Sequence, residues 1–302
     1  MSTSINIGII GCDTSHVPAF TQLLNDTSAA HHVPGGKVVA AFPGGSPDFA
    51  LSYTRIEGIA NKLREGYNVN IVDSPEAVAE QCDAILLESV DGRVHLEQFK
   101  RIAPYRKPVF IDKPFAVSSA EAKAIAREAY TYGIPIMSCS ALRYSEGFTY
   151  ALNDSGGSGD IIACDAYGPM EIEPTQPGLF WYGIHTVEML YAALGKGCRQ
   201  VTAVSNEDHD LVVGVWSDGR IGTIRGNRKG NMAFGALLHR ERATSYVDVS
   251  ADDKPFYASM LEHIITMFRT GEAPIDPAET LEIVRFIEAA NESRKDGRVV
   301  YL

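Results

Sequence analysis

Short apolar runs alternate with helical patterns through the first half of the chain. The apolar runs are rich in β-branched residues and end at glycine, proline or polar residues, which is typical of buried strands. They lie at residues 5–10, 37–42, 69–72, 84–87, 109–111 and 134–137. The helical patterns that follow them lie at residues 17–24, 59–64, 75–78, 95–103 and 118–132. This alternation predicts a doubly wound parallel sheet with right-handed crossovers.

Beyond about residue 143, strand-like runs follow one another with few helices between them. These runs lie at residues 161–167, 201–204, 211–216, 221–225, 232–238 and 245–249, and helical patterns lie at 183–194, 256–270 and 277–294. Consecutive short strands predict an open, mainly antiparallel sheet. The expected fold is therefore α/β, with an N-terminal Rossmann-type doubly wound parallel sheet (residues 1–141) and a C-terminal α+β domain (residues 142–302).

Composition narrows the class of protein. The chain has 302 residues, 45% of them hydrophobic, and a net charge of −11 without a basic run. This size allows two cores, and the charge argues against nucleic acid or an anionic membrane as a partner. Five scattered cysteines and the lack of a signal pattern predict a cytoplasmic protein with reduced thiols. No metal site is expected, because no Cys-x-x-Cys pair occurs and His31-His32 stands in a loop without partner ligands.

The run Val109-Phe110-Ile111 ends abruptly in Asp112-Lys113-Pro114. Proline cannot extend a sheet ladder, so Lys113 is expected at the carboxyl tip of a buried strand. In open parallel sheets, ligands bind outside the carboxyl ends of the strands. An ammonium group there can hydrogen-bond a substrate hydroxyl. The alternative is an ordinary surface lysine beside a turn.

A glycine turn follows the first strand. A full dinucleotide fingerprint would place glycine at the positions of Gly11, Asp13 and His16, and only Gly11 is present. Thr14 and Ser15 can still donate hydrogen bonds, and the start of the next helix still favours an anion. The alternative is a capping turn without a ligand, with Asp13 or Thr14 as the N-cap.

The second strand ends without an acidic residue that could hold the adenosine ribose. Its absence removes a repulsion against a 2′-phosphate, and Ser46 with the neighbouring glycine amides could receive one. This favours NADP over NAD, although the loop contains no arginine. The alternative is a plain irregular loop.

Several motifs in order resemble the glucose–fructose oxidoreductase/inositol dehydrogenase (Gfo/Idh/MocA) family. They are Gly8-Ile9-Ile10-Gly11, Asp112-Lys113-Pro114, Gly183-Ile184-His185, and Asn291-Glu292-Ser293 before Val299-Val300-Tyr301-Leu302. The resemblance implies hydride transfer between a nicotinamide and a sugar-like or cyclitol carbon. It also implies that Lys113 contacts the substrate hydroxyl and that His185 accepts the proton, a role that suits imidazole.

The expected site has three groups of residues. The catalytic residues are Lys113 and His185. Cofactor contacts are expected from Gly11, Asp13, Thr14, Ser15, His16, Ser46, Glu88, Ser89, Asp112 and Pro114. Substrate contacts are expected from Arg143, Tyr144, Trp181 and Tyr182. Three pairs of these residues also have a structural alternative. Glu88-Ser89 could be a strand-end cap, Arg143-Tyr144 an interdomain contact, and Trp181-Tyr182 part of the core.

Two departures from the family pattern bear on activity, and one is Asp13 in place of the second fingerprint glycine. Many relatives carry an acid four residues before the histidine, where this chain has Trp181, and Glu188 on the same helix is a candidate to orient His185 instead. The sequence thus favours an NAD(P)-dependent dehydrogenase that acts on a small polyhydroxylated substrate and forms a homo-oligomer (dimer or tetramer). The alternatives are a catalytically inactive member that binds a sugar-like ligand or a protein, and a lyase or hydrolase that retains the nucleotide.

Overall fold

The computed structural model describes residues 4–153 and 156–302. The chain forms two compact units. Unit 1 contains the residues up to Ala116, Ala120–Cys139 and Tyr257–Pro277, and unit 2 contains Val117–Ser119, Ser140–Phe256 and Ala278–Leu302. The boundary expected after residue 141 falls close to the junction at 139/140, whereas residues 257–277 return to unit 1.

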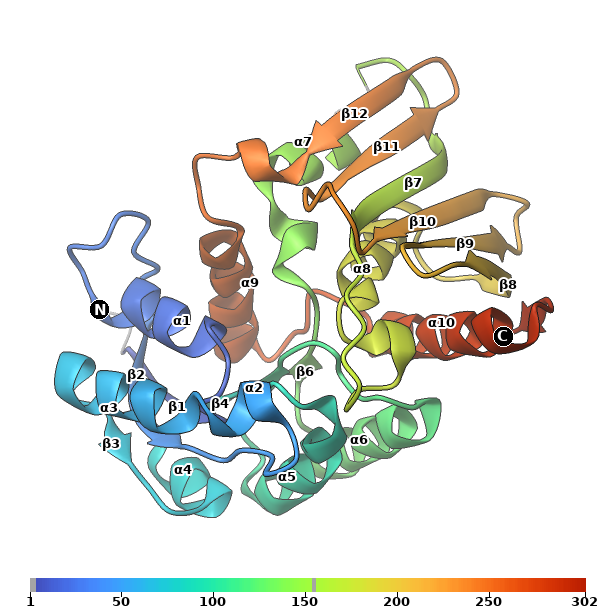
Figure 1. Ribbon diagram of the computed structural model, residues 1–302. Coiled ribbons are helices and arrows are strands. Elements are labelled where there is room, and N and C mark those ends of the chain that lie inside the picture. Colours follow the sequence, from blue (N-terminus) through green and yellow to red (C-terminus); the bar gives the residue numbers. More distant parts are fainter. Residues whose placement is uncertain (1–3, 154–155) are drawn as a thin grey trace. The chain divides into compact units, whose positions relative to one another are not determined.

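Unit 1 is built on a six-stranded parallel sheet, sheet A, with the strand order β3-β2-β1-β4-β5-β6. Its strands are β1 (Ile5–Ile10), β2 (Gly36–Phe42), β3 (Asn70–Ile71), β4 (Ala84–Leu87), β5 (Val109–Ile111) and β6 (Ile136–Met137). Its helices are α1 (His16–Asn25), α2 (Ala50–Tyr53), α3 (Ile56–Tyr67), α4 (Pro75–Gln81), α5 (His95–Ile102), α6 (Ser119–Tyr132) and α9 (Phe256–Thr270). Within this unit, helices lie on both faces of the sheet (Figure 1). The order reverses between β1 and β4, which is where ligands bind in folds of this class.

The central strands of sheet A are continuous apolar runs because both of their faces are covered. All four residues of β4 and all three of β5 are buried. Helix α9 belongs to the same core: a Cβ added to Gly36 would lie 2.5 Å from Ile7 Cδ1 and 2.8 Å from Ile265 Cδ1. The last but one helix of the chain therefore packs against the first two strands.

Unit 2 contains a seven-stranded mixed sheet, sheet B, in the order β12-β11-β7-β10-β9-β8-β13. Only the β7–β10 pair is parallel among its pairs over the described residues. Its strands are β7 (Ile161–Pro169), β8 (Cys198–Ser205), β9 (His209–Trp216), β10 (Ile221–Asn227), β11 (Gly235–Arg240), β12 (Thr244–Asp248) and β13 (Val300–Tyr301), and its helices are α7 (Glu146–Asn153), α8 (Gly183–Leu194) and α10 (Pro277–Asp296).

Glycines let two helices approach sheet B closely. Gly214 and Gly222 face each other across β9 and β10. A Cβ at Gly222 would lie 2.5 Å from Leu190 of α8, and one at Gly214 would lie 2.7 Å from Phe286 of α10. These two helices therefore cover one face of the sheet, with α10 and α8 lying beside it in Figure 1.

The predicted fold class is confirmed: a parallel doubly wound sheet is followed by a mixed, mainly antiparallel one. Among the described residues, no helix is both long and apolar enough to cross a bilayer. The sequence analysis missed helix α7 and the two-residue strand β13, and it began β11 three residues too early. Helix α7 buries only Phe148, so its apolar stripe is too weak to be recognised.

Candidate functional site

The turn after β1 is tight and is fixed by contacts with two other strands. Gly11 donates its N–H to Phe42 O at 2.9 Å, and its φ of +95° is a backbone conformation that favours glycine. A Cβ at this position would lie 2.4 Å from Ser89 N and 2.5 Å from Ser89 Oγ. The first glycine of the fingerprint is therefore required both by the backbone conformation and by the close approach of Ser89.

Asp13, at the position of the second fingerprint glycine, has a fully buried side chain. Its carboxylate accepts hydrogen bonds from Ser52 Oγ at 2.6 Å and from Val90 N at 2.9 Å. Burial raises the pKa of Asp13, and these two hydrogen bonds offset part of that rise. The acid is thus satisfied inside unit 1 and is not the N-cap of α1.

The N-cap of α1 is Ser15, which makes no side-chain capping hydrogen bond. Thr14 Oγ1 lies 3.4 Å from His16 N and accepts its hydrogen, so Thr14 is the residue that supplies a capping oxygen. The side chain of Ser15 is exposed. Of the two capping residues that the sequence allowed, the structure favours Thr14.

The loop after β2 is tied to the loop after β4 through acidic side chains. Ser46 Oγ donates to Asp91 Oδ2 at 2.6 Å. Arg93 forms ion pairs with both Asp91, at 2.7 Å, and Asp48, at 2.9 Å. The Ser46 hydroxyl and the nearby guanidinium are both engaged with carboxylates, so the preference for NADP gains no support from this loop.

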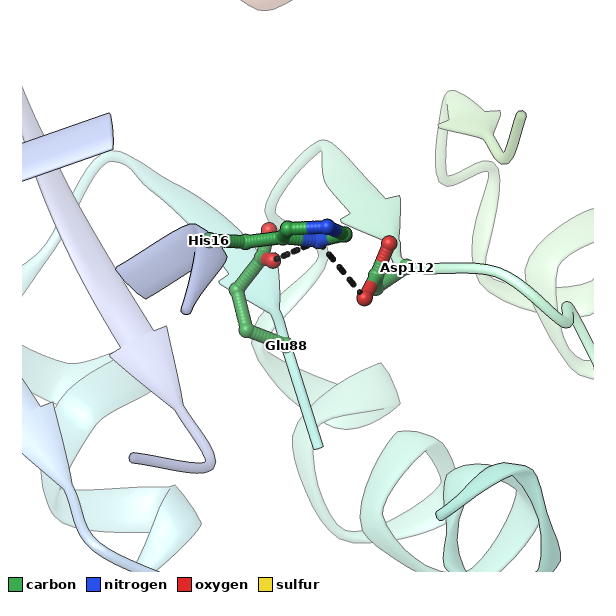
Figure 2. Close-up of side chains that lie close together, drawn as sticks. All are labelled: His16, Glu88 and Asp112. Atoms are coloured by element: carbon green, nitrogen blue, oxygen red, sulfur yellow. Dashed lines mark ion pairs between the residues drawn. The ribbon is translucent and has the colours of Figure 1, made fainter. Parts of the chain in front are cut away.

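Three predicted cofactor contacts come together at the carboxyl edge of sheet A. His16 begins α1, Glu88 follows β4, and Asp112 follows β5; Figure 2 shows their side chains converging. His16 Nδ1 lies 3.0 Å from Asp112 Oδ2 and 3.9 Å from Glu88 Oε2. The exposed fractions are 0% for Glu88, 1% for Asp112 and 8% for His16. We call these residues the edge cluster.

Aromatic side chains hold the imidazole of the edge cluster in place. The His16 ring packs against Phe20 of α1, with ring centroids 5.5 Å apart. It also meets Tyr257 of α9 edge to face, at 5.0 Å. The position of His16 is therefore fixed by its own helix and by the helix that returns to unit 1 late in the chain.

The two carboxyl groups of the edge cluster differ in acidity. Burial raises the pKa of Glu88 well above its ordinary value, and the charge of Asp112 raises it further. Burial also acts to raise the pKa of Asp112, but the nearby His16 and Lys113 outweigh it and hold that pKa below its usual range. The arrangement therefore favours a proton on Glu88 and a charge on Asp112.

Lys113 follows Asp112 at the end of β5, as the sequence predicts, and its side chain is 8% exposed. The peptide bond between Lys113 and Pro114 is cis. The loop after β4 is fixed by His95. Its Nε2 lies 2.8 Å from Ser89 O and donates the hydrogen bond, since a carbonyl oxygen can only accept. Ser89 Oγ donates to Gln98 Oε1 at 2.8 Å.

In unit 2, His185 lies in the first turn of α8. Its Nδ1 is 2.7 Å from Ser140 Oγ, and its ring meets Tyr182 and Phe234 edge to face at 5.6 and 5.5 Å. Ser140 is buried and also accepts the N–H of Leu142 at 3.3 Å. When the hydroxyl accepts a hydrogen bond from Nδ1–H, the lone pair on Nε2 is the basic position of the ring.

Arg143, in the short helix Ala141–Tyr144, is buried and faces two carboxylates. Its Nε lies 3.4 Å from Glu188 Oε2, and its Nη2 donates to Glu279 Oε1 at 2.6 Å. Glu188 thus pairs with Arg143, and Ser140 contacts the imidazole of His185, so the expectation that Glu188 orients His185 gains no support. Tyr144 is half-buried.

Trp181 and Tyr182 immediately precede α8, with ring centroids 6.1 Å apart. Trp181 is buried and Tyr182 is half-buried. The burial of Trp181 fits core packing, whereas the half-buried Tyr182 meets His185 edge to face.

Glu188 should make unit 2 less stable as the pH rises. Burial raises the pKa of Glu188 from 4.5 to about 7, Arg143 lowers it, and Glu279 raises it. Between these values the unfolded chain releases a proton that the folded chain keeps, so stability is highest below pH 4.5 and falls up to pH 7. The loss is about 3 kcal/mol. Urea unfolding between pH 4.5 and 8 should show that the free energy of unfolding falls more steeply with pH in the wild type than in Glu188→Gln. An equal pH dependence in the two proteins would contradict this prediction.

Sequence reasoning missed the partners that fix these side chains. Ser52 and Asp91 hold Asp13 and Ser46 in unit 1, and Ser140 and Glu279 hold His185 and Arg143 in unit 2. These contacts join residues 39 to 136 positions apart, and no local pattern signals such pairings. Lys113 belongs to unit 1 and His185 to unit 2.

Comparison with known protein families assigns a family to most of unit 1. Residues 5–138 match the family model described as "Oxidoreductase family, NAD-binding Rossmann fold" (Gfo/Idh/MocA). Residues 5–138 belong to this family. The match spans β1 to β6, and it confirms the resemblance seen in the Asp112-Lys113-Pro114 motif.

Solved structures share the fold of the whole chain at low sequence identity. GenD2 from gentamicin A biosynthesis, in complex with NAD, matches with a TM-score of 0.80 and 15% identity, covering 100% of this chain and 97% of that one. The scyllo-inositol dehydrogenase of Lactobacillus casei, with NAD(H) and scyllo-inositol, has a TM-score of 0.80 and 13% identity, covering 99% of each chain. A putative myo-inositol dehydrogenase of Sinorhizobium meliloti has a TM-score of 0.78 and 16% identity, and the match also covers 99% of each chain. No curated protein matches the sequence.

Proposed function

We propose that the protein is an NAD(H)-dependent oxidoreductase that transfers hydride between the nicotinamide and a hydroxyl-bearing carbon of a sugar-like or cyclitol substrate. The family match over residues 5–138 carries this proposal. Structures of the same fold with bound NAD(H) and inositol support the class of substrate. The chain's own contribution is Lys113 at the carboxyl end of β5 and His185 paired with Ser140.

The residues of the glycine turn fit a dinucleotide. The positive φ of Gly11 preserves the tight turn, and the carboxylate of Asp13 is bonded to Ser52 and Val90. The backbone start of α1 would hold the pyrophosphate. We infer NAD rather than NADP, because Asp48 and Asp91 place negative charge beside Ser46, where a 2′-phosphate would need a cation.

The bound nicotinamide supplies a two-electron acceptor or donor for the substrate carbon. The side chains supply the proton chemistry: Lys113 donates a hydrogen bond to the substrate hydroxyl, and His185 takes the hydroxyl proton at Nε2. Ser140 Oγ, 2.7 Å from Nδ1, would accept a hydrogen bond from Nδ1–H and so stabilise the tautomer that this requires. Tyr182 would contact the apolar face of the substrate ring.

Calorimetric titration with NAD⁺, NADH, NADP⁺ and NADPH, after removal of any carried-over nucleotide, tests the proposal. Binding of NAD(H) tighter than about 100 μM is expected, equivalent to roughly −5.5 kcal/mol. A screen of polyols and sugars, followed by the absorbance of the reduced cofactor, should then identify a substrate. Failure of all four nucleotides to bind would refute the oxidoreductase proposal and favour a ligand-binding or protein-binding module on the same fold.

We also propose that the open face of sheet B forms a homo-oligomer interface, as the resemblance implies. This face carries exposed apolar side chains at Leu237 and Tyr246, beside a cavity of about 390 Å³ that they line with Leu211 and Arg225. Contiguous apolar surface of this kind is typical of interaction sites. Sedimentation velocity should give a dimer or tetramer, and a monomer at micromolar concentration would contradict the proposal.

A further inference from the structure

The edge cluster contains buried polar atoms that the protein does not satisfy. His16 Nδ1, both carboxylate oxygens of Glu88 and Oδ2 of Asp112 have no hydrogen-bond partner. His16 Nδ1 and Asp112 Oδ2 form an ion pair at 3.0 Å, whereas neither oxygen of the buried Glu88 carboxyl group has a hydrogen-bond donor. A fully buried carboxyl group without a donor is costly, so these atoms are expected to have a ligand.

The spacing of the three donors suits a metal ion. One ligand atom from each residue lies within 4.8 Å of the others. A cation held at about 2.1 Å separates neighbouring donors by roughly 3.0 Å in octahedral and about 3.4 Å in tetrahedral coordination. The 3.0 Å between His16 Nδ1 and Asp112 Oδ2 matches the octahedral value. The 3.9 Å between His16 Nδ1 and Glu88 Oε2 would have to shorten by about 0.9 Å, which a movement of the Glu88 side chain can provide.

We propose that His16, Glu88 and Asp112 bind one divalent transition-metal ion. One imidazole nitrogen with two carboxylate oxygens favours ions such as Mn²⁺, Fe²⁺ or Zn²⁺ over Mg²⁺ and Ca²⁺, which prefer oxygen ligands alone. Three protein ligands leave coordination positions open for water or a substrate oxygen. Among residues 4–153 and 156–302, no other group of three histidine, cysteine or acidic side chains lies this close, so a single equivalent is expected.

The edge cluster shares the carboxyl edge of sheet A with Lys113, but binding of a metal ion to it requires neither substrate nor turnover. Metal binding can therefore be measured on the protein alone, whether or not it binds a nicotinamide nucleotide.

Manganese binding tests the proposal directly. Protein freed of metal with a chelator is titrated with Mn²⁺, and free Mn²⁺ is counted by electron paramagnetic resonance. One bound equivalent is expected, with electron-spin-echo modulation from a directly coordinated imidazole nitrogen and displacement by Zn²⁺. The absence of bound Mn²⁺, or bound Mn²⁺ without nitrogen coupling, would overturn the proposal even if no variant folds.

Matched variants assign the site. Glu88→Gln removes one ligand charge and should weaken Mn²⁺ binding at least tenfold, whereas Glu57→Gln changes an exposed carboxylate on α3 and should leave binding unchanged. His16→Asn should abolish the nitrogen coupling, and His31→Gln, at an exposed histidine, should preserve it. Equal affinities in Glu88→Gln and wild type, or retained coupling in His16→Asn, would refute the assignment. Nucleotide titration with and without Mn²⁺ separates this outcome from the test of the oxidoreductase proposal.

Discussion

Lys113→Met is expected to lower kcat by at least about a thousandfold, within the range typical for loss of a positioned proton-transfer or hydrogen-bonding group. Methionine has a similar length but cannot donate a hydrogen bond to the substrate hydroxyl. Lys113 lies at the carboxyl end of β5, whereas the pyrophosphate would be held by the start of α1. The affinity for NAD(H) should therefore stay within a few-fold. Steady-state kinetics on the substrate from the polyol screen, with calorimetry of NAD(H), measure both quantities.

Two further variants separate the chemistry of Lys113 from its charge and from general damage. Lys113→Arg keeps the positive charge beside Glu88 and Asp112 but moves the donors, so it should retain nucleotide binding and stability without full turnover. Lys123→Met changes an exposed lysine on α6 and should leave kcat unchanged. Turnover in Lys113→Met equal to that of wild type would remove Lys113 from the proposed mechanism.

The fold was predictable where burial is continuous. Strands β1, β4 and β5 are apolar along nearly their whole length because helices cover both faces of sheet A, and such runs are the strongest local signal in a sequence. The return of α9 to unit 1 was not predictable. Its apolar stripe shows that it packs on a core, but nothing local shows which core.

The site was predictable residue by residue but not as an assembly. Strand ends identify Glu88 and Asp112 as edge residues, and the glycine turn identifies His16. Their convergence depends on β4 lying between β1 and β5, which is a property of the strand order. The sequence analysis expected no metal, because it sought ligands close together in the chain. The roles of all these residues, the oligomeric state and the cytoplasmic location stay predictions.

Gly11→Ala is expected to destabilise unit 1 by about 2–5 kcal/mol, combining an unfavourable positive φ with overpacking. The new Cβ would meet the backbone of Ser89 at 2.4 Å, and backbone cannot turn away as a flexible side chain can. Neither strand can shift easily, because Gly11 N is bonded to Phe42 O and Glu88 N to Ile10 O, at 2.9 and 2.7 Å. Urea unfolding followed by far-ultraviolet circular dichroism measures the loss, and weaker NAD(H) binding should accompany it.

Gly58→Ala is the matched control, and its effect should have the opposite sign. Gly58 lies inside α3 of the same unit, and a Cβ there meets nothing within 4 Å. Both substitutions restrict the unfolded chain equally, but alanine suits a helix interior and should stabilise it by about 0.5–1 kcal/mol. The difference between the two variants therefore isolates the folded turn at Gly11. Equal stabilities would mean that the turn can relax around a side chain, and a glycine would then not be required at the first position of the fingerprint.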